Sequence, residues 1–540
     1  MDSDVLIVGA GPTGLTLAID LGRRGVRCTL IEQKPRPAFL PKMERINART
    51  MEIYRRMGLA RKIRAAGLRP DCPMDVYVIL ALNEPPLLHL AYPSVEQAQR
   101  NARAVNDGTM PAEPYQLISQ YTLEPLLKSI AETMPSITVR FGCEFLALRQ
   151  DAQGVTARVQ SDGVTQEIRA AYLVGCDGGG SLVRKELGIG LSGEGNLLGL
   201  RQALFRCEEL FDRLPVGQGP GKGRHYHVAD DKATFLIMQD STKHWTLHSM
   251  VDSDEEMTAA FERTVGIPVK YEMLSCAPWR QNLLLADRYG EGRVFLAGDA
   301  VHLVIPTGGL GMNSGVGDAI DLSWKLAATL AGWGGPRLLK SYEIERRQIG
   351  DRNVGASRYA TIGRRKWRSM WRPNIREDSP AGAETRKNLG AVADVEQRKS
   401  NEMIGAELGY RYVDSPVICN IPGGPEHLFR DYQPTTWPGA RLPHIWLEDG
   451  TPMQDRIAEG FTIVRLGGTT AETGGLERAI AARGAPVTVL DVSDRVAREV
   501  YGYDLILVRP DLHVVWRANT APEDAAEVAA VATGHVRDGF

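Results

Sequence analysis

Three glycines and an acid near the start of the chain have the spacing of a diphosphate-binding turn. Gly9, Gly11 and Gly14 fit the pattern GxGxxG, and Glu32 follows 18 residues after the last glycine. Glycines let the backbone approach a pyrophosphate, and the amides at a helix N-terminus favour its charge. A carboxylate at the end of the next strand can accept hydrogen bonds from ribose hydroxyls. The spacing therefore predicts a dinucleotide site, with a ligand-free tight turn as the alternative.

Two further glycine-rich turns each contain an aspartate. Residues 173–181 read LVGCDGGGS, with Asp177 directly after an apolar run. Consecutive glycines let the backbone lie flat against a ligand, whereas Asp177 alone could simply cap the following helix. Residues 295–300 read FLAGDA, and GGLGMN follows at 308–313. There Asp299 could accept hydrogen bonds from a polyol chain, and free amides at the next helix would stabilise developing negative charge.

The tripeptide His225-Tyr226-His227 also contains side chains that could take part in catalysis. Alternate side chains of a strand face opposite sides, so the two histidines share one face and Tyr226 points to the other. A histidine titrates near neutral pH and a tyrosine can relay a proton, so the cluster is a candidate for acid–base chemistry. The alternative is that these side chains are structural or lie on the surface.

The elements that must position these residues alternate between strand and helix. Residues 5–8 form a continuous aliphatic run typical of a buried parallel strand, and residues 14–24 have apolar side chains at helical spacing. Residues 26–32 then resume a strand. Alternating runs over residues 200–280 predict an antiparallel sheet whose one face could roof a pocket. A long helix is expected over 313–331.

The last third of the chain has a different organisation. Residues 364–372 read RRKWRSMWR, which we interpret as a solvated helix or connector, with a docking surface as the alternative. Beyond residue 439, short strands separated by two helical patterns predict a compact α/β domain of its own.

Composition excludes several classes of function. A chain of 540 residues is long enough for two or three domains, and 64 basic against 66 acidic residues leave no excess charge for nucleic acid. No run of 18 uncharged apolar residues occurs, so no membrane span is expected. The acidic start is unlike a secretory signal, which predicts a cytoplasmic protein. Seven scattered cysteines contain no CxxC pair, so neither a disulfide framework nor a metal site is expected.

Taken in order, these motifs resemble those of a known family. GAGPTG, then GCDGGGS, then FLAGDAVHLVIPTGGLGMNSGVGDAIDLSWKLA are similar to the single-component (class A) FAD-dependent aromatic hydroxylases, most of all to the phenol and dichlorophenol hydroxylase branch. PKMERINARTMEIYRRMGL and ISQYTLEPLL share this likeness. PGARLPHIWLEDGT and DLILVRPDLHVVWR are similar to the thioredoxin-like C-terminal domain of these enzymes.

The resemblance implies an α/β protein with a Rossmann-like (GR2-type) FAD-binding domain, an antiparallel-sheet substrate domain and a C-terminal thioredoxin-like domain. It also implies a homodimer. The expected segments are 1–73, 116–190 and 281–360 for the FAD-binding domain, 74–115 and 191–280 for the substrate domain, 361–410 for a helical connector, and 411–540 for the thioredoxin-like domain.

The resemblance also assigns cofactor contacts. The expected FAD-binding residues are Gly9, Gly11, Pro12, Thr13, Gly14, Glu32, Lys42, Arg45, Gln120, Phe145, Asp177, Gly178, Gly298, Asp299, Pro306, Gly309, Gly311, Met312 and Asn313. Many relatives have Arg-Ala where this chain has Lys42-Met43. Arg45 is the residue that could replace the missing arginine contact, or it could instead bind a substrate carboxylate.

What the resemblance implies chemically is hydroxylation of a phenolic aromatic substrate, next to its hydroxyl group. NAD(P)H would reduce FAD, and O2 would form a C4a-hydroperoxyflavin that delivers an electrophilic oxygen. A base near the phenol is expected, and the candidates are Glu44, which matches an acid of phenol hydroxylases, with Tyr226 and His227. The alternatives are a Baeyer–Villiger or epoxidising oxygenase acting on a polycyclic natural product, and a flavin-dependent reductase.

Overall fold

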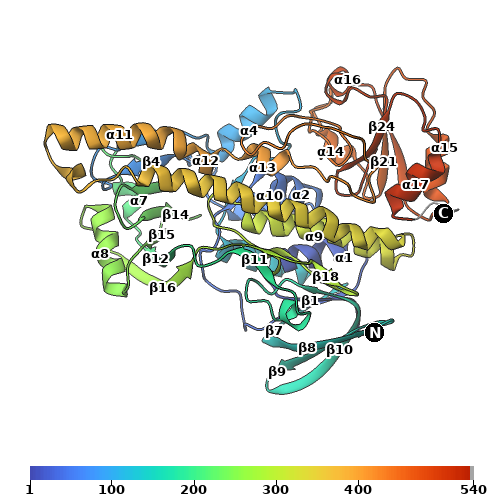
Figure 1. Cartoon of the computed structure of the whole chain (residues 1–540), viewed down its shortest axis with the longest axis horizontal. Coiled ribbons are helices and arrows are strands. Elements are labelled where there is room, and N and C mark those ends of the chain that lie inside the picture. Colours follow the sequence, from blue (N-terminus) through green and yellow to red (C-terminus); the bar gives the residue numbers. More distant parts are fainter. Residues whose placement is uncertain (536–540) are drawn as a thin grey trace.

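The largest sheet of the protein is built from strands that are far apart in the sequence. We describe it from a computed structural model covering residues 1–535 (Figure 1). Strand β1 (Ser3–Val8) pairs in parallel with β2 (Cys28–Glu32) on one side and with β10 (Val164–Gly175) on the other. The eight strands lie in the order β18 (Gly290–Glu291), β19 (Val294–Leu296), β10, β1, β2 and β7 (Ile137–Phe141), with β9 (Gly154–Ser161) paired to β10 and β8 (Cys143–Asp151) to β9.

The aliphatic run at residues 5–8 is buried in the centre of this sheet, as its composition predicts. Helix α1 (Pro12–Arg23) follows β1 and packs against α9 (Gly311–Leu330). Helix α1 begins two residues earlier than the apolar spacing suggests. Proline suits the first helical turn because its φ is already helical and its missing N–H would have no partner there.

The sequence EIYRRMGLARKIRA at residues 52–65 is typical of a single helix, but the structure has two helices here, α2 (Ala48–Arg56) and α3 (Ala60–Ala66). Gly58 has a φ of +75° between them, a conformation that ends a helix and suits glycine. The other helices of this half are α4 (Val95–Ala104), α5 (Gln120–Ala131), α6 (Leu182–Glu186), α7 (Leu210–Arg213) and α8 (Asp254–Val265).

The alternating runs over residues 200–280 form an antiparallel sheet, as predicted. Its strands lie in the order β16 (Glu272–Arg280), β12 (Gly199–Arg206), β15 (His244–Ser249), β14 (Phe235–Met238), β13 (His225–Val228), β4 (Val76–Ile79) and β5 (Leu88–Leu90). Strand β4 joins it in parallel with β13. One face packs against α8, where the rings of Phe205 and Phe261 stack with centroids 4.1 Å apart. The opposite face is left for a cavity.

The basic run at 364–372 is helical as far as residue 368, as expected, but only part of it is exposed to solvent. It continues α10 (Pro336–Arg368), a helix of 33 residues that runs from the C-terminal domain to the seven-stranded sheet (Figure 1). Trp367 is fully buried and clusters with Leu389 of α11 (Pro380–Glu396). Arg365 and Lys366 are exposed on the opposite side. Residues three and four apart share one face of a helix, so only part of the run meets solvent.

After α11 the chain forms α12 (Arg398–Asn401) and α13 (Ile404–Leu408) before it enters the C-terminal domain. That domain has a four-stranded sheet in the order β22 (Val487–Val492), β21 (Phe461–Leu466), β23 (Leu505–Val508) and β24 (Val514–Ala518). Strands β21 and β22 are parallel and the other two pairs are antiparallel. With α15 (Gly474–Ala481), α16 (Arg495–Tyr501) and α17 (Ala525–Thr533), this confirms the α/β fold with a thioredoxin-like C-terminal unit.

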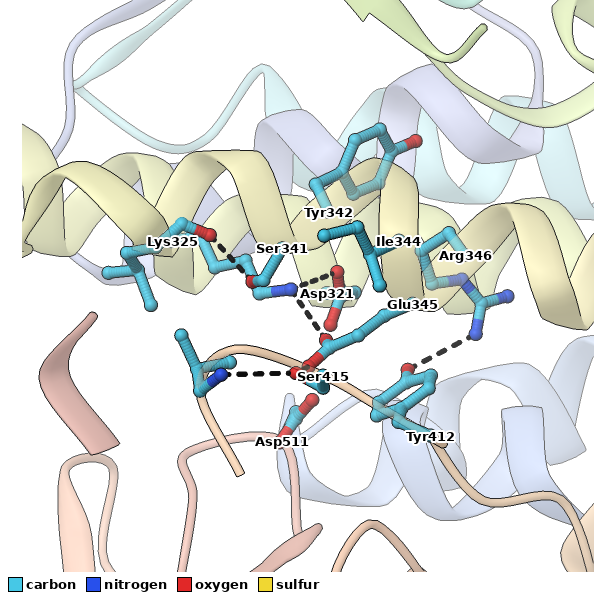
Figure 2. A network of polar contacts seen from close by, with 12 residues as sticks. Asp321, Lys325, Ser341, Tyr342, Ile344, Glu345, Arg346, Tyr412, Ser415 and Asp511 are labelled. Carbon is cyan, nitrogen blue, oxygen red and sulfur yellow. Dashed lines mark hydrogen bonds and ion pairs between the residues drawn. The ribbon is translucent and has the colours of Figure 1, made fainter. Parts of the chain in front are cut away.

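Buried charges join the C-terminal domain to α9 and α10. Arg509 is fully buried and donates hydrogen bonds to Glu345 (2.6 Å) and Asp511 (2.5 Å). Figure 2 shows Lys325 bonded to both Asp321 and Glu345, at 2.7 and 2.6 Å. Three carboxylates thus share two cations in one buried cluster. Burial and the neighbouring Glu345 raise the pKa of Asp321 to about 8, with Lys325 and Arg509 opposing the shift. Within residues 1–535 we found no helix of the length and apolarity that crossing a bilayer requires.

Candidate active site

A cavity of about 960 Å³ is lined by residues of both large sheets and by residues of helices α10 and α12. All three glycine-rich turns contribute to its wall. So do Lys42, Gln120 and Phe145, which come from segments between those turns. The tertiary structure therefore brings most of the expected cofactor residues to one place.

The turn between β1 and α1 has the shape that a diphosphate requires. At Gly9, where φ is +104°, a Cβ would lie 2.3 Å from the carbonyl oxygen of Cys176. At Gly14 a Cβ would lie 2.0 Å from the carbonyl oxygen of Gly9. At Gly11 it would meet no atom closer than 3.9 Å, on the side chain of Glu124. Two glycines thus allow the turn to close, and the third keeps space open beside the helix amides.

Gly11, Pro12 and Thr13 line the cavity, whereas Gly14 lies behind them. Glu32 also lines it, and its carboxylate accepts hydrogen bonds from the amides of Ala10 and Lys34, both at 3.0 Å. These bonds hold the Glu32 oxygens beside the turn, where a ribose would lie against them.

The second turn serves two purposes. Asp177 caps α6, because its carboxylate accepts from the amides of Leu182 (2.8 Å) and Val183 (3.1 Å). The helix-cap alternative is therefore correct, and Asp177 nevertheless lines the cavity together with Gly178, whose φ is +80°.

The third turn presents an acid with no hydrogen-bond partner among the described residues. Asp299 faces the cavity, and burial raises the pKa of its carboxyl, opposed by the charges of His302 and Lys42. This unbonded carboxylate, just after β19, can accept hydrogen bonds from the hydroxyls of a polyol chain. His302 itself is bonded to Asp318 at 2.8 Å and fully buried, so it is structural.

The start of α9 is open to the same cavity. No side chain caps this helix, and Gly311, Met312 and Asn313 of its first turn line the wall. The Asn313 side chain donates to the carbonyl of Gly309 at 2.6 Å, which fixes the turn. Uncapped first-turn amides favour a ligand group that gains negative charge.

Pro306 completes this wall, but Gly298 does not reach it. At Gly298, where φ is +66°, a Cβ would lie 2.7 Å from Oγ1 of Thr13. Its role in the structure is to let Thr13 approach β19. Orphaned acceptors, open glycines and uncapped amides together fit FAD.

Arg45 lines the cavity, but it is already neutralised. Its guanidinium forms an ion pair with Glu407 of α13 and lies over the ring of Tyr115, 5.5 Å from the centroid. The two functions expected for Arg45, binding cofactor or a substrate carboxylate, each have to compete with Glu407. Nothing in the sequence near residue 45 could reveal a partner that lies 362 residues further on.

Glu44 forms a hydrogen-bonded pair with His225. Oε1 of Glu44 lies 2.9 Å from Nε2 of His225, and Oε2 lies 3.4 Å from the buried Arg224. Burial would raise the pKa of Glu44, but His225, Arg224 and Arg45 together lower it to about 2. Glu44 is therefore an ionised, oriented hydrogen-bond acceptor at neutral pH.

The other two candidate catalytic residues lie in different surroundings. His227 lines the cavity, but burial, reinforced by Arg364 and Arg368, lowers its pKa well below the usual range, so it is a weak base. Tyr226 is outside the cavity lining, in the core on the other face of the sheet. Its hydroxyl donates to the carbonyl of Gly221 at 3.0 Å. Because alternate side chains of the strand face opposite sides, Tyr226 lies on the other face from the two histidines, as expected. It therefore does not line the cavity.

Three lining residues come from the segment interpreted as a connector: Arg364 of α10, and Ser400 and Asn401 of α12. Arg364 belonged to the charge run read as solvated. The local sequence feature that could have indicated that Arg364 points inward is Trp367, an apolar residue three positions away and therefore on the same helix face.

Comparison with known proteins identifies the family. Residues 2–357 match the model of the FAD binding domain, and residues 435–535 match the aromatic-ring hydroxylase C-terminal model. The FAD-dependent monooxygenase apdD of Emericella nidulans is 33% identical over 98% of this chain and 90% of its own. Aklavinone 12-hydroxylase RdmE of Streptomyces purpurascens is 33% identical over 97% of each chain.

A solved structure agrees with these relatives over the whole length. RebC, soaked with chromopyrrolic acid and with bound 7-carboxy-K252c, has a TM-score of 0.90 and 31% identity, covering 99% of each chain. FAD is therefore the cofactor, with NAD(P)H as the usual reductant of such enzymes. The chain belongs to the single-component FAD-dependent monooxygenases of the aromatic-ring hydroxylase family.

Proposed function

We propose that this enzyme uses NAD(P)H and O2 to hydroxylate a phenolic aromatic substrate in the cavity between its two large sheets. The observation that carries this proposal is the Glu44–His225 pair, which lies on the wall of the same cavity as the FAD-binding turns. Bound FAD, once reduced, would activate O2 for insertion of one oxygen atom into the ring. The protein must bind the ring, take up the phenol proton and exclude water.

The pair supports a role for His225 as the acceptor of the phenol proton. Glu44, with a pKa of about 2, can only accept, so Nε2 of His225 must be the donor in their 2.9 Å hydrogen bond. In a neutral imidazole this leaves Nδ1 of His225 free to accept a proton. The phenol then becomes an electron-rich phenolate, and the Glu44 carboxylate stabilises the imidazolium that forms.

Helices α12 and α13 help to separate this chemistry from solvent. Met403, between them, is buried, and its side chain lies within 3.3 Å of the position that a Cβ on Gly308 would occupy. Glu407 ties α13 to the start of α2 by accepting from the amide of Ala48 at 3.2 Å. The segment therefore covers the flavin-binding turn and limits the access of water.

The test combines three measurements on the purified FAD-bound protein. NADH and NADPH oxidation, O2 consumption and product mass are followed with phenol, 2,4-dichlorophenol, 1-naphthol and a hydroxyanthraquinone. We expect at least one phenol to accelerate NAD(P)H oxidation and to gain one oxygen atom as a new ring hydroxyl. A lactone or epoxide product would overturn hydroxylation in favour of the other oxygenations. Oxidation that no phenol accelerates would overturn the proposal.

A further inference from the structure

Arg364 faces the cavity as an unpaired cation. It lines the cavity near the C-terminal end of α10, and no described residue forms a hydrogen bond or ion pair with its guanidinium. Its nearest aromatic contact is Phe235, with the guanidinium carbon 5.3 Å from the ring centroid. A cation–π contact recovers only part of the cost of taking a charge out of water.

The charged and titratable neighbours of Arg364 do not supply a counterion. Arg368, one turn further on, donates to the carbonyls of Val228 and Thr234, both at 3.0 Å, and adds positive charge. His227 and His248 face it from the sheet, and burial keeps both neutral at neutral pH. Burial and Arg368 lower the pKa of Arg364 to about 9, which still leaves it protonated at neutral pH.

Among residues 1–535, the one carboxylate whose charge acts on Arg364 is that of Glu44, and it is already bonded to His225 and faces Arg224. Two neutral side chains of α12, the helix that packs against α10, line the same cavity and can donate hydrogen bonds. Oγ of Ser400 is buried without a partner. Oδ1 of Asn401 accepts from Gln397 at 3.1 Å, which leaves the Asn401 amide N–H groups available.

We propose that Arg364, assisted by Ser400 and Asn401, binds a carboxylate group of the substrate. A guanidinium pairs with a carboxylate through two parallel hydrogen bonds, and neutral donors on α12 can satisfy further oxygen lone pairs. The inference rests on the proposed hydroxylase function, because the bound acid is the compound to be hydroxylated. It assigns the substrate class as hydroxylated aromatic acids, and it places acid recognition at Arg364 instead of at Arg45.

The test is a binding comparison with the FAD-bound enzyme, without NAD(P)H. The probes are 1-hydroxy-2-naphthoic acid and 1-naphthol, which differ only in the carboxylate, and binding is followed by the change in flavin absorbance. A charge-assisted pair predicts that wild type binds the acid about tenfold or more tightly than the naphthol. Arg364→Met is expected to remove this preference while leaving the Kd for 1-naphthol within about twofold, and Arg364→Lys to restore part of it.

Arg365→Met is the matched control, because Arg365 is the exposed neighbour on the same helix. This variant should keep the wild-type preference. The proposal is overturned if wild type binds the acid no more tightly than the naphthol, including the case in which neither binds. It is also overturned if Arg364→Met weakens both ligands equally, since that would indicate a structural role.

Binding and turnover keep the two proposals separate. If neither the acid nor any phenol of the panel gains oxygen when NAD(P)H and O2 are added, the hydroxylase function is contradicted even though the acid binds through Arg364. Oxygen insertion into 1-naphthol by an enzyme that shows no preference for the acid contradicts only the carboxylate site.

Discussion

Charged side chains on the cavity wall differ in whether they already have a partner of opposite charge, that is, whether their charge is matched. Glu44 is matched by His225 and Arg224, and Arg45 is matched by Glu407. Arg364 has no such partner among residues 1–535. A matched charge can orient a neighbour and assist catalysis, whereas an unmatched one calls for a charged ligand.

The matched pair leads to a prediction about rate. Glu44→Gln removes the acceptor that orients His225 and stabilises its protonated form, so kcat for a phenol that the enzyme hydroxylates should fall about 100-fold. Because the pKa of Glu44 is about 2, its carboxylate is ionised throughout pH 6–9. Glu44 itself therefore does not titrate in that range, and any change with pH in the ratio of wild-type to variant kcat should come from His225, whose protonated form loses the stabilising charge in the variant.

Product formation at several pH values, normalised to bound FAD, gives this ratio. Glu167→Gln provides the control, since Glu167 is an exposed acid paired with Arg149 away from the cavity. An unchanged kcat in Glu44→Gln would show that the phenol proton leaves by another route.

At the scale of single elements, the three glycines in the turn from β1 to α1 have two different roles. Two of them allow the backbone to close tightly, and the third leaves space for a ligand. Gly9 and Gly14 would place a Cβ 2.3 and 2.0 Å from backbone oxygens, which are atoms that cannot easily move. Gly11 has no such neighbour. The three glycines of one motif therefore have distinct physical roles.

This difference can be measured with two alanine variants. Gly14→Ala should distort the turn and destabilise the protein by several kcal/mol. Gly11→Ala should leave the Tm of the apoprotein unchanged but weaken FAD binding by about tenfold, because the methyl group enters the space of the diphosphate. Thermal unfolding of the apoprotein and FAD titration give the two quantities. Equal losses of stability in both variants would refute the distinction.

At the scale of the whole molecule, buried ion pairs join the C-terminal domain to the FAD-binding half. Arg509 precedes the turn into β24, whereas Glu345 and Lys325 lie on α10 and α9 (Figure 2). Buried charges stabilise only while they are balanced, because an unpaired charge in a dry interior is costly. The attachment of the domain therefore depends on all members of the cluster.

Removing one cation should reveal this dependence. Arg509→Met leaves Glu345 and Asp511 with less compensation, and the free energy of unfolding should fall by about 3–5 kcal/mol. Arg465→Met is the control in the same domain, because the pair of Arg465 with Asp491 is exposed and is expected to contribute about 1 kcal/mol or less. Urea denaturation of both variants provides the comparison. A loss no larger in Arg509→Met than in Arg465→Met would contradict a structural role for the cluster.

The parts of this protein that the sequence predicted depend on short-range rules. Turns such as GAGPTG and GCDGGGS have few backbone solutions, so their residue types predicted a dinucleotide site and, with the family resemblance, FAD. Strand alternation correctly separated Tyr226 from His225 and His227. It did not show which face meets the cavity, since that depends on what packs against the sheet.

Only the tertiary structure decided which charges are free. Glu407 reaches Arg45 across 362 positions of the chain, and the same fold leaves Arg364 facing the cavity without a partner. Electrostatic pairing depends on distance in space and on burial, neither of which a local pattern contains. The sequence by itself predicted a dinucleotide site and the order of strands and helices, and the likeness of its motifs to a known family implied FAD and hydroxylation, because these signals lie within single turns and strands. Which charged residues line the cavity was decided by how distant helices pack.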